Sequence, residues 1–153
     1  MNFAKIVSPA DNSEFSSYFY FRWFYLRKPL NKKLGTERDD IENQSIHRMV
    51  ISKKEQIIAV GRLHDISLLA SQIRYFAVDE NYRRSGIGTY LMNDLESIAY
   101  DRNKKDIILN ARENAVLFYE KLGYKIIQKT NLLYGKIQHY KMKKTIQSNP
   151  KFK

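Results

Sequence analysis

The chain has 153 residues, of which 43% are hydrophobic and 13% aromatic, and its formal net charge is +11. This length fits one domain, and this apolar content excludes wholesale disorder. Because there is no cysteine and the three histidines are scattered, disulfides and thiolate nucleophiles are excluded and no metal is expected. No membrane-spanning apolar run and no signal peptide are recognisable, so we expect a cytoplasmic protein without a membrane partner. The charge favours an anionic partner, either nucleic acid or a polyphosphate cofactor.

The first half of the chain is predicted to contain strands around one aromatic helix. After a strand at 3–7, the segment Glu14 to Leu26 is dense in aromatic residues, and its length favours a helix with Ser13 as N-cap. Such an aromatic stripe is more often core than a platform for stacking bases. A polar loop follows from Pro29 to Asp40. Three strands are then expected, with a hairpin turn at 53–55, over residues 47–52, 56–64 and 72–78.

The second half alternates strands with two helices. The helix expected over 86–103 places apolar residues on one face, and a second amphipathic helix over 113–122 ends before Gly123. Further strands are expected at 106–109, 124–128 and 137–142. This order predicts an α/β (α+β) fold around one sheet. We expect residues 1–145 to form a single domain and residues 146–153 to form a basic, disordered tail.

The residues that follow the strand at 72–78 have the pattern of an anion-binding helix start. The first turn of a helix leaves backbone N–H groups unpaired and carries partial positive charge. Gly86 and Gly88 would leave that backbone accessible to a ligand, and Arg83 and Arg84 add positive charge. The pattern indicates a phosphate or pyrophosphate site, although a turn whose glycines serve packing alone would look the same.

Two motifs, in the right order, resemble signatures of the GNAT superfamily of N-acetyltransferases. Arg83-Arg84-Ser85-Gly86-Ile87-Gly88 is similar to its Gln/Arg-x-x-Gly-x-Gly/Ala motif, and Ala115 to Tyr124 is similar to its Ala-x-x-Phe-Tyr-x-x-x-Gly-Phe/Tyr helix. The similarity runs from about Val50 to Met142 and extends to small, mostly uncharacterised bacterial acetyltransferases. It implies a mixed, mostly antiparallel central sheet of about six to seven strands flanked by helices. It also implies an enzyme that transfers the acetyl group of acetyl-CoA to a primary amine by direct attack.

The resemblance also implies roles for individual residues. Tyr119 matches the tyrosine that protonates the departing CoA thiolate, which requires a phenol near the sulfur. Backbone groups at the end of the strand would bind the pantetheine arm, and amides of the following turn would bind the pyrophosphate. The residues implied in cofactor binding are Phe76, Ala77, Val78, Arg83, Arg84, Ser85, Gly86, Ile87, Gly88, Thr89, Asn110, Arg112 and Phe118.

Several positions depart from the family pattern. Arg112 stands seven residues before Tyr119, where many relatives carry asparagine or glutamine. The inward strand positions that often supply a glutamate or histidine base hold Gln72 and Arg74. Arg74 stays charged and cannot act as a base. It is instead a candidate for binding an anionic group on the acceptor, or for a structural ion pair.

The general base is therefore open. His64 is the best histidine candidate because its ordinary pKa is near neutral, although a structural histidine fits its position as well; His47 and His139 are weaker candidates. The acidic loop with Glu37 and Asp39 is a candidate for holding a cationic amine, or is simply solvated. Water is a further candidate for accepting the proton.

Other functions and the identity of the acceptor also remain open. A small-molecule amine and a protein or peptide amine both fit as acceptors, and the sequence is compatible with a homodimer. One alternative is a basic nucleic-acid-binding module, which is disfavoured because no nucleic-acid-binding signature is present. Another is a catalytically silent sensor that binds CoA without turnover.

Overall fold

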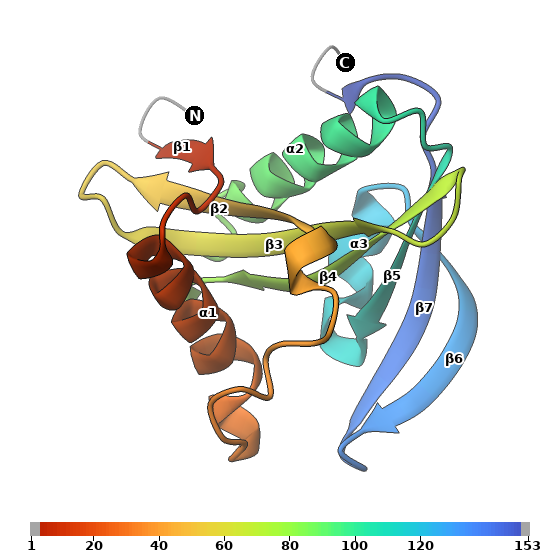
Figure 1. The fold of residues 1–153 in the computed structure, drawn as a ribbon. Helices are drawn as coiled ribbons and strands as arrows, with labels where there is room; N and C mark the ends of the chain where they lie inside the picture. Colours follow the sequence, from red (N-terminus) through yellow and green to blue (C-terminus); the bar gives the residue numbers. More distant parts are fainter. Residues whose placement is uncertain (1–3, 151–153) are drawn as a thin grey trace.

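The computed structural model describes residues 4–150, which form one seven-stranded sheet in the order β1-β2-β3-β4-β5-β7-β6 (Figure 1). The strands are β1 (Ala4–Val7), β2 (Ile46–Ser52), β3 (Ile57–Asp65), β4 (Ala70–Val78), β5 (Asp106–Arg112), β6 (Lys125–Leu133) and β7 (Ile137–Thr145). The β4–β5 pair is parallel and the other pairs are antiparallel. The expected mixed, mostly antiparallel sheet is therefore confirmed.

Helices cover both faces of the sheet. On one face, α1 (Asn12–Leu26) packs its aromatic residues against the middle strands, in a cluster that includes Tyr18, Phe19, Val60 and Ala77. On the other, α2 (Ile87–Asp101) and α3 (Val116–Lys121) pack on the larger core. Short 3₁₀ helices occupy Lys28–Leu30, Glu42–Gln44, Glu80–Tyr82 and Glu113–Ala115. The inward-facing part of the aromatic stripe of α1 is thus core, as the sequence indicated, whereas Tyr20 and Phe24 are exposed.

Two details differ from the expectation. The N-cap of α1 is Asp11 instead of Ser13, because the Asp11 carboxylate accepts a 2.8 Å hydrogen bond from the Glu14 amide. Residues 146–150 are packed on the domain instead of forming a disordered tail. Ile146 is buried, and Asn149 accepts a hydrogen bond from Ser97 on α2. Residues 151–153 lie outside the described residues.

The central feature for function is the separation of β4 from β5. Their pairing ends at Ile73 and Leu109, although both strands continue beyond these residues. On its other side β4 carries a bulge, where Tyr75 and Phe76 stand opposite the single residue Gly61 and Tyr75 has a positive φ of 55°. A bulge bends a strand and redirects its side chains. Beyond Ile73, the edge of β4 that faces β5 is therefore free to pair with a ligand.

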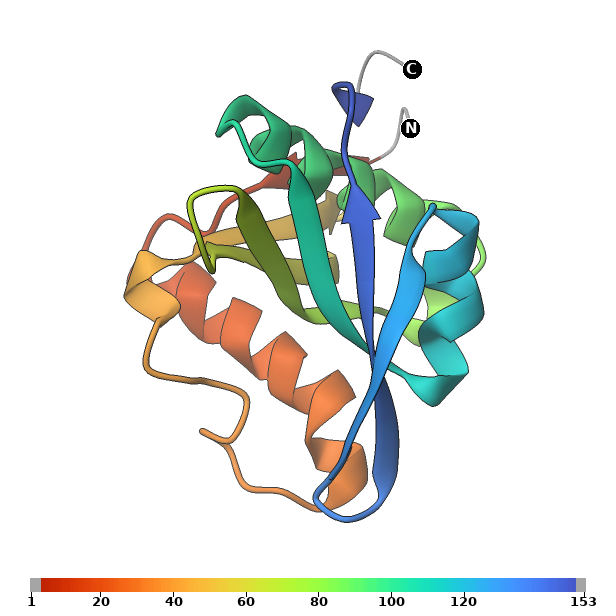
Figure 2. The ribbon, with the colours of Figure 1, turned by 90° about the vertical axis from the view of Figure 1, so that its right-hand side faces the viewer.

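The β6–β7 hairpin extends past the rest of the sheet towards the end of α1 (Figure 2). Tyr134, in the hairpin turn, stacks under the Arg27 guanidinium, with 5.7 Å between the arginine Cζ and the ring centroid. Segments that are about a hundred residues apart in sequence thus close one end of the opening between β4 and β5.

Candidate active site

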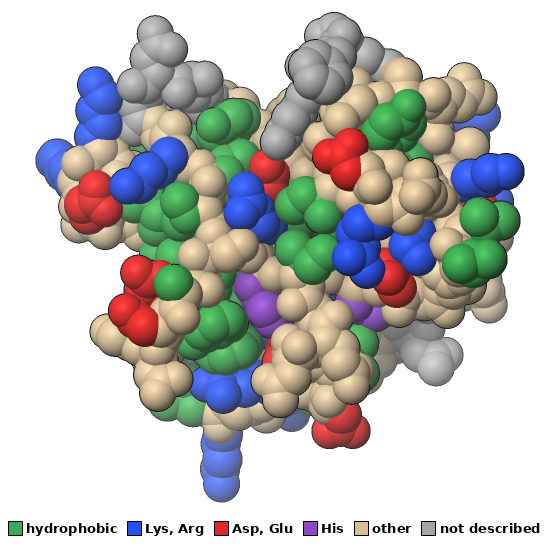
Figure 3. Space-filling view, turned by 45° about the horizontal axis from the view of Figure 1, so that its top comes forward, with side chains coloured by type: hydrophobic (Ala, Val, Ile, Leu, Met, Phe, Trp, Pro, Cys, Tyr) green, Lys and Arg blue, Asp and Glu red, His purple; other side chains and the backbone are tan. Residues whose placement is uncertain are grey.

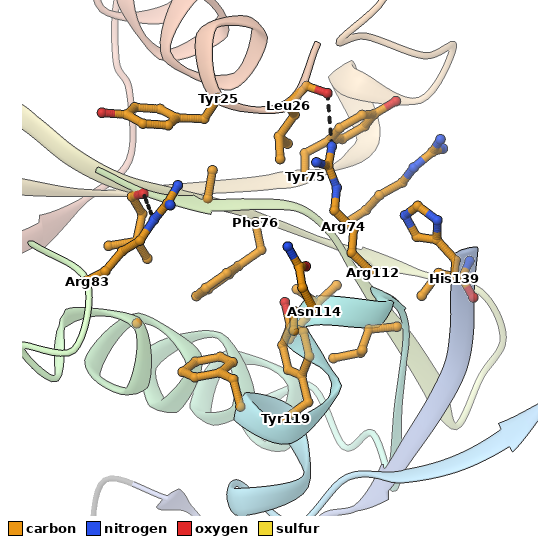
Figure 4. A pocket seen from close by; sticks show the side chains of 18 of the residues that line it. Tyr25, Leu26, Arg74, Tyr75, Phe76, Arg83, Arg112, Asn114, Tyr119 and His139 are labelled. Carbon is orange, nitrogen blue, oxygen red and sulfur yellow. Dashed lines mark hydrogen bonds between the residues drawn. The ribbon is translucent and has the colours of Figure 1, made fainter. Parts of the chain in front are cut away.

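A cavity of about 1230 Å³ occupies the opening between β4 and β5. Its wall is built from the end of α1, the second half of β4, the start of α2, helix α3 and the β6–β7 hairpin. Figure 4 shows Arg83 on one side, Arg74, Arg112 and His139 on the other, and Phe76 and Tyr119 between them. The cavity therefore brings together most of the residues that the sequence motifs singled out.

The turn before α2 forms one end of the cavity. Gly86 is the N-cap of α2 with a φ of 89°, and no side chain caps the first turn. Arg83, Arg84 and Thr89 line the cavity beside it. A helix start with free N–H groups and adjacent arginines fits a phosphate group. Ser85 does not line the cavity, and its hydroxyl donates to the Tyr82 carbonyl.

Two other members of the motif serve packing. Ile87 is fully buried in the core, so only its backbone is available to a ligand. A Cβ atom on Gly88 would meet the Phe118 ring 3.1 Å away, so this glycine permits the close approach of α3 to α2. Packing therefore accounts for Gly88, which also lines the cavity, whereas the positive φ of Gly86 accounts for the glycine there by its backbone conformation.

The second half of β4 supplies a free backbone edge. Phe76, Ala77 and Val78 all line the cavity, and all lie beyond the last β4–β5 pair at Ile73. The Val78 carbonyl accepts a 3.3 Å hydrogen bond from Arg83 Nε, which ties the arginine to the strand. The remaining edge has the arrangement needed to hydrogen-bond an extended amide chain as an added strand.

Tyr119 lies on α3 at the middle of the cavity. Its ring is buried among aromatic rings, with centroids 5.0 Å from Phe118, 6.3 Å from Phe76 and 5.9 Å from Tyr124. Burial raises the pKa of the phenol well above its usual value, and the Arg112 guanidinium acts in the opposite direction. The group is therefore protonated at neutral pH, as a proton donor must be.

The far end of the cavity is cationic. Arg27, Arg74 and Arg112 line it, together with His139 and Asn110. The Nδ1 atom of His139 lies 3.0 Å from the Ile137 carbonyl oxygen, which can only accept, so Nδ1 carries the proton of the neutral ring and Nε2 carries the lone pair. Burial, Arg112 and Arg27 lower the pKa of His139, against the opposing hydrogen bond to Ile137.

Three predicted site residues lie elsewhere. His64 does not line the cavity; it lies 3.4 Å from Arg62 Nη2, and burial and that arginine lower its pKa. Glu37 is buried, and its carboxylate accepts from the Gly35 amide. Asp39 accepts two hydrogen bonds from Arg62, at 2.7 and 2.9 Å. Their positions therefore do not support His64 as the base or the two carboxylates as acceptor ligands.

Both interpretations of Arg74 have support. It donates to Asp39 at 3.0 Å, as a structural ion pair would, and it also lines the cavity with its side chain 46% exposed. Sequence reasoning missed the contribution of α1, because a helix end gives no motif. The cavity residues missed in this way are Tyr25 and Leu26 from α1, Arg27 directly after it, and Tyr134 from the hairpin.

The charge of the cavity differs from that of the surface. Among the described residues that line it, none is aspartate or glutamate, whereas the cationic ones are Arg27, Arg74, Arg83, Arg84, Arg112 and Lys121. On the face that carries α2, by contrast, basic and acidic side chains are interspersed (Figure 3). The cavity is therefore suited to anionic groups at both ends.

Comparisons with known proteins show the family of this chain. A family model described as an acetyltransferase (GNAT) domain matches residues 29–146. An uncharacterised N-acetyltransferase of Bacillus subtilis, YjcF, is 30% identical over 140 residues, which cover 92% of this chain and 99% of that protein.

Two solved structures share the fold. A structure of an N-acetyltransferase from Lactobacillus plantarum has a TM-score of 0.84 at 19% identity, covering 95% of this chain and 100% of that one. An aminoglycoside 6'-N-acetyltransferase in complex with coenzyme A has a TM-score of 0.78 at 17% identity, covering 94% and 98%. Within residues 4–150, no helix is long and apolar enough to cross a membrane, and no group of three histidine or acidic side chains is placed to hold a metal.

Proposed function

We propose that the cavity between β4 and β5 is the active site of this chain, which belongs to the GNAT acetyltransferase family and is an acetyl-CoA-dependent N-acetyltransferase acting on an amine. One observation carries the proposal: the cavity has an anion-binding helix start at one end and the protonated Tyr119 at its middle. Within residues 4–150, no comparable site favours nucleic-acid binding.

The residues present fit coenzyme A. The α2 amides with Arg83 and Arg84 would hold the pyrophosphate, and the free edge of β4 at Phe76 and Val78 would hold the pantetheine arm. When bound, acetyl-CoA supplies an activated thioester. Holding the amine and that thioester side by side accounts for much of the expected rate.

Tyr119 is proposed as the general acid. Its phenol remains protonated at neutral pH because burial raises its pKa, and Arg112 partly offsets that rise. The amine nitrogen forms a bond to the carbonyl carbon, the carbon–sulfur bond breaks, and the Tyr119 proton goes to the sulfur. A backbone N–H near Val78 would stabilise the charge that develops on the carbonyl oxygen.

His139 replaces His64 as the proposed proton acceptor. It lies in the cavity wall, and its Nε2 carries the lone pair that can take a proton from the amine. Burial keeps the ring neutral at physiological pH by lowering its pKa. A cytoplasmic location and a homodimer stay predictions.

Two measurements test the function. Titration calorimetry should show acetyl-CoA binding, and release of free CoA thiol should depend on an added amine. Binding without amine-dependent thiol release across a broad panel would favour the silent sensor, and absence of binding would refute the cofactor site.

A further inference from the structure

We propose that the acceptor is an amine that also bears a carboxylate or another oxyanion, and that Arg27, Arg74 and Arg112 bind this anionic group. The inference rests on the proposed function, because it places the acceptor at the end of the cavity opposite the α2 start. It names the chemical class of acceptor, which membership of the family leaves open.

Two guanidinium groups meet at one oxygen atom in this end of the cavity. Arg27 Nη1 donates to the Leu26 carbonyl oxygen at 3.0 Å, and Arg112 Nη2 donates to the same oxygen at 2.9 Å. Arg27 is only 6% exposed and Arg112 is half-buried. Two cations held this close in a poorly solvated place repel each other and lose hydration.

The described residues do not neutralise this pair. In residues 4–150 neither Arg27 nor Arg112 forms an ion pair with a carboxylate. Leu26 ends α1, and the C-terminal end of a helix carries only about half a negative charge. The third cation, Arg74, shares Asp39 with Arg62. An excess of positive charge therefore remains at this end.

The cofactor does not account for that excess. Its phosphates are assigned to the α2 start, where Arg83 and Arg84 lie, and Figure 4 shows Arg83 across the cavity from Arg74 and Arg112. Phe76 and Tyr119 stand between the two ends. The anion that fits Arg27 and Arg112 must therefore come with the acceptor.

Such an acceptor also suits the chemistry. Arginine forks match the geometry of carboxylate and phosphate oxygens. Nearby cations disfavour the ammonium form of the amine, so more of it is present as the neutral nucleophile. A polycation such as spermidine or an aminoglycoside would be repelled by the same charges. An amino acid or an aminoalkyl phosphonate has both required groups.

The test is thiol release with matched amine pairs. L- and D-amino acids are compared with their carboxamides. Aminoalkyl phosphonates serve as a second class of amine with an oxyanion, and spermidine and kanamycin represent polycations. We expect an acid to exceed its carboxamide in kcat/KM by about 10- to 100-fold, as for a charged hydrogen bond in a binding site. Comparing kcat/KM for the carboxylate-bearing and the phosphonate-bearing amines then shows which oxyanion the site prefers.

Arginine variants test which residues cause the preference for the acid over its carboxamide. Arg27→Gln and the more exposed Arg74→Gln should each raise KM for the acid about 10-fold or more and leave both the carboxamide KM and the acetyl-CoA Kd unchanged. Arg102→Gln, on an exposed arginine that does not line the cavity, is the control. Because Arg27 is buried, thermal unfolding is measured for every variant.

The outcomes separate the two proposals. The anionic acceptor is refuted, while the enzyme function stands, if carboxamides or polycations have the same kcat/KM as the acids. It is also refuted if both arginine variants keep the preference for the acid. If no amine releases thiol, the proposed function fails as well.

Discussion

Gly88 and Phe118 are in such close contact that a Cβ atom on the glycine would lie 3.1 Å from Cζ and 3.2 Å from Cε1 of the ring. The contact joins the first turn of α2 to α3. Phe118 in turn lies 6.2 Å from Phe76 and 5.0 Å from Tyr119, measured between ring centroids. Gly88, which lines the cavity, is therefore linked through Phe118 to Tyr119, the proposed general acid.

Gly88→Ala should lower both stability and turnover. The added methyl group forces Phe118 to move, and overpacking of this kind costs about 1–3 kcal/mol, against a gain in helix propensity of about 1 kcal/mol. Urea unfolding and kcat with saturating acetyl-CoA measure the two effects. Unchanged turnover would show that the Gly88–Phe118 contact does not position Tyr119.

Gly86→Ala should weaken acetyl-CoA binding beyond its cost in stability. A φ of 89° is unfavourable for alanine by about 1–2 kcal/mol, so the turn that presents the α2 amides would distort. The matched control is Gly35→Ala, which has a φ of 106° and does not line the cavity. Both variants should lose stability, and calorimetry should show lower affinity in Gly86→Ala alone.

Tyr119→Phe should lower kcat by about 10²–10⁴-fold while leaving acetyl-CoA affinity nearly unchanged, because only the proton donor is lost. Tyr124→Phe is the control, since Tyr124 packs against Tyr119 but does not line the cavity. A loss of rate in both variants would indicate disturbed packing instead of lost acid catalysis.

His139→Asn should remove the acidic limb of the pH dependence of kcat. A base must be neutral to accept a proton, so the rate falls as pH drops through the pKa of His139. Because burial lowers that pKa below 6.5, the midpoint should lie below 6.5. His64→Gln, outside the cavity, should keep the limb. An identical limb in His139→Asn would exclude His139 as the base.

Asp39→Asn should destabilise the fold by about 2 kcal/mol, because the fully buried Arg62 keeps Glu42 but loses the other of its two paired carboxylates. Hydrogen bonding to Arg62 holds the pKa of Asp39 at about 2, below its usual 3.8. Its contribution is therefore complete above pH 3.8 and is lost as pH falls through 2. Urea unfolding compares Asp39→Asn with Asp40→Asn, at an exposed neighbour whose substitution should change the free energy of unfolding little.

Much of the fold was predictable because local patterns carry it. Apolar runs and turn residues placed every strand, although β6 was expected at 124–128 and runs to Leu133, and the β4–turn–α2 motif and the α3 helix pointed to the proposed cofactor end. The N-cap was misassigned to Ser13 because both Asp11 and Ser13 have suitable side chains, and only the backbone conformation distinguishes them.

Sequence by itself determined the strand–helix order, the turn with Gly86 that is proposed to bind an anion, and the tyrosine on α3. Tertiary structure alone decided which polar side chains face the cavity. Arg27 and His139 come from distant segments that meet only when the hairpin reaches α1, whereas His64 and Asp39 are held by Arg62 outside it. Motifs record local backbone requirements, but charges from separate elements become one site only through packing.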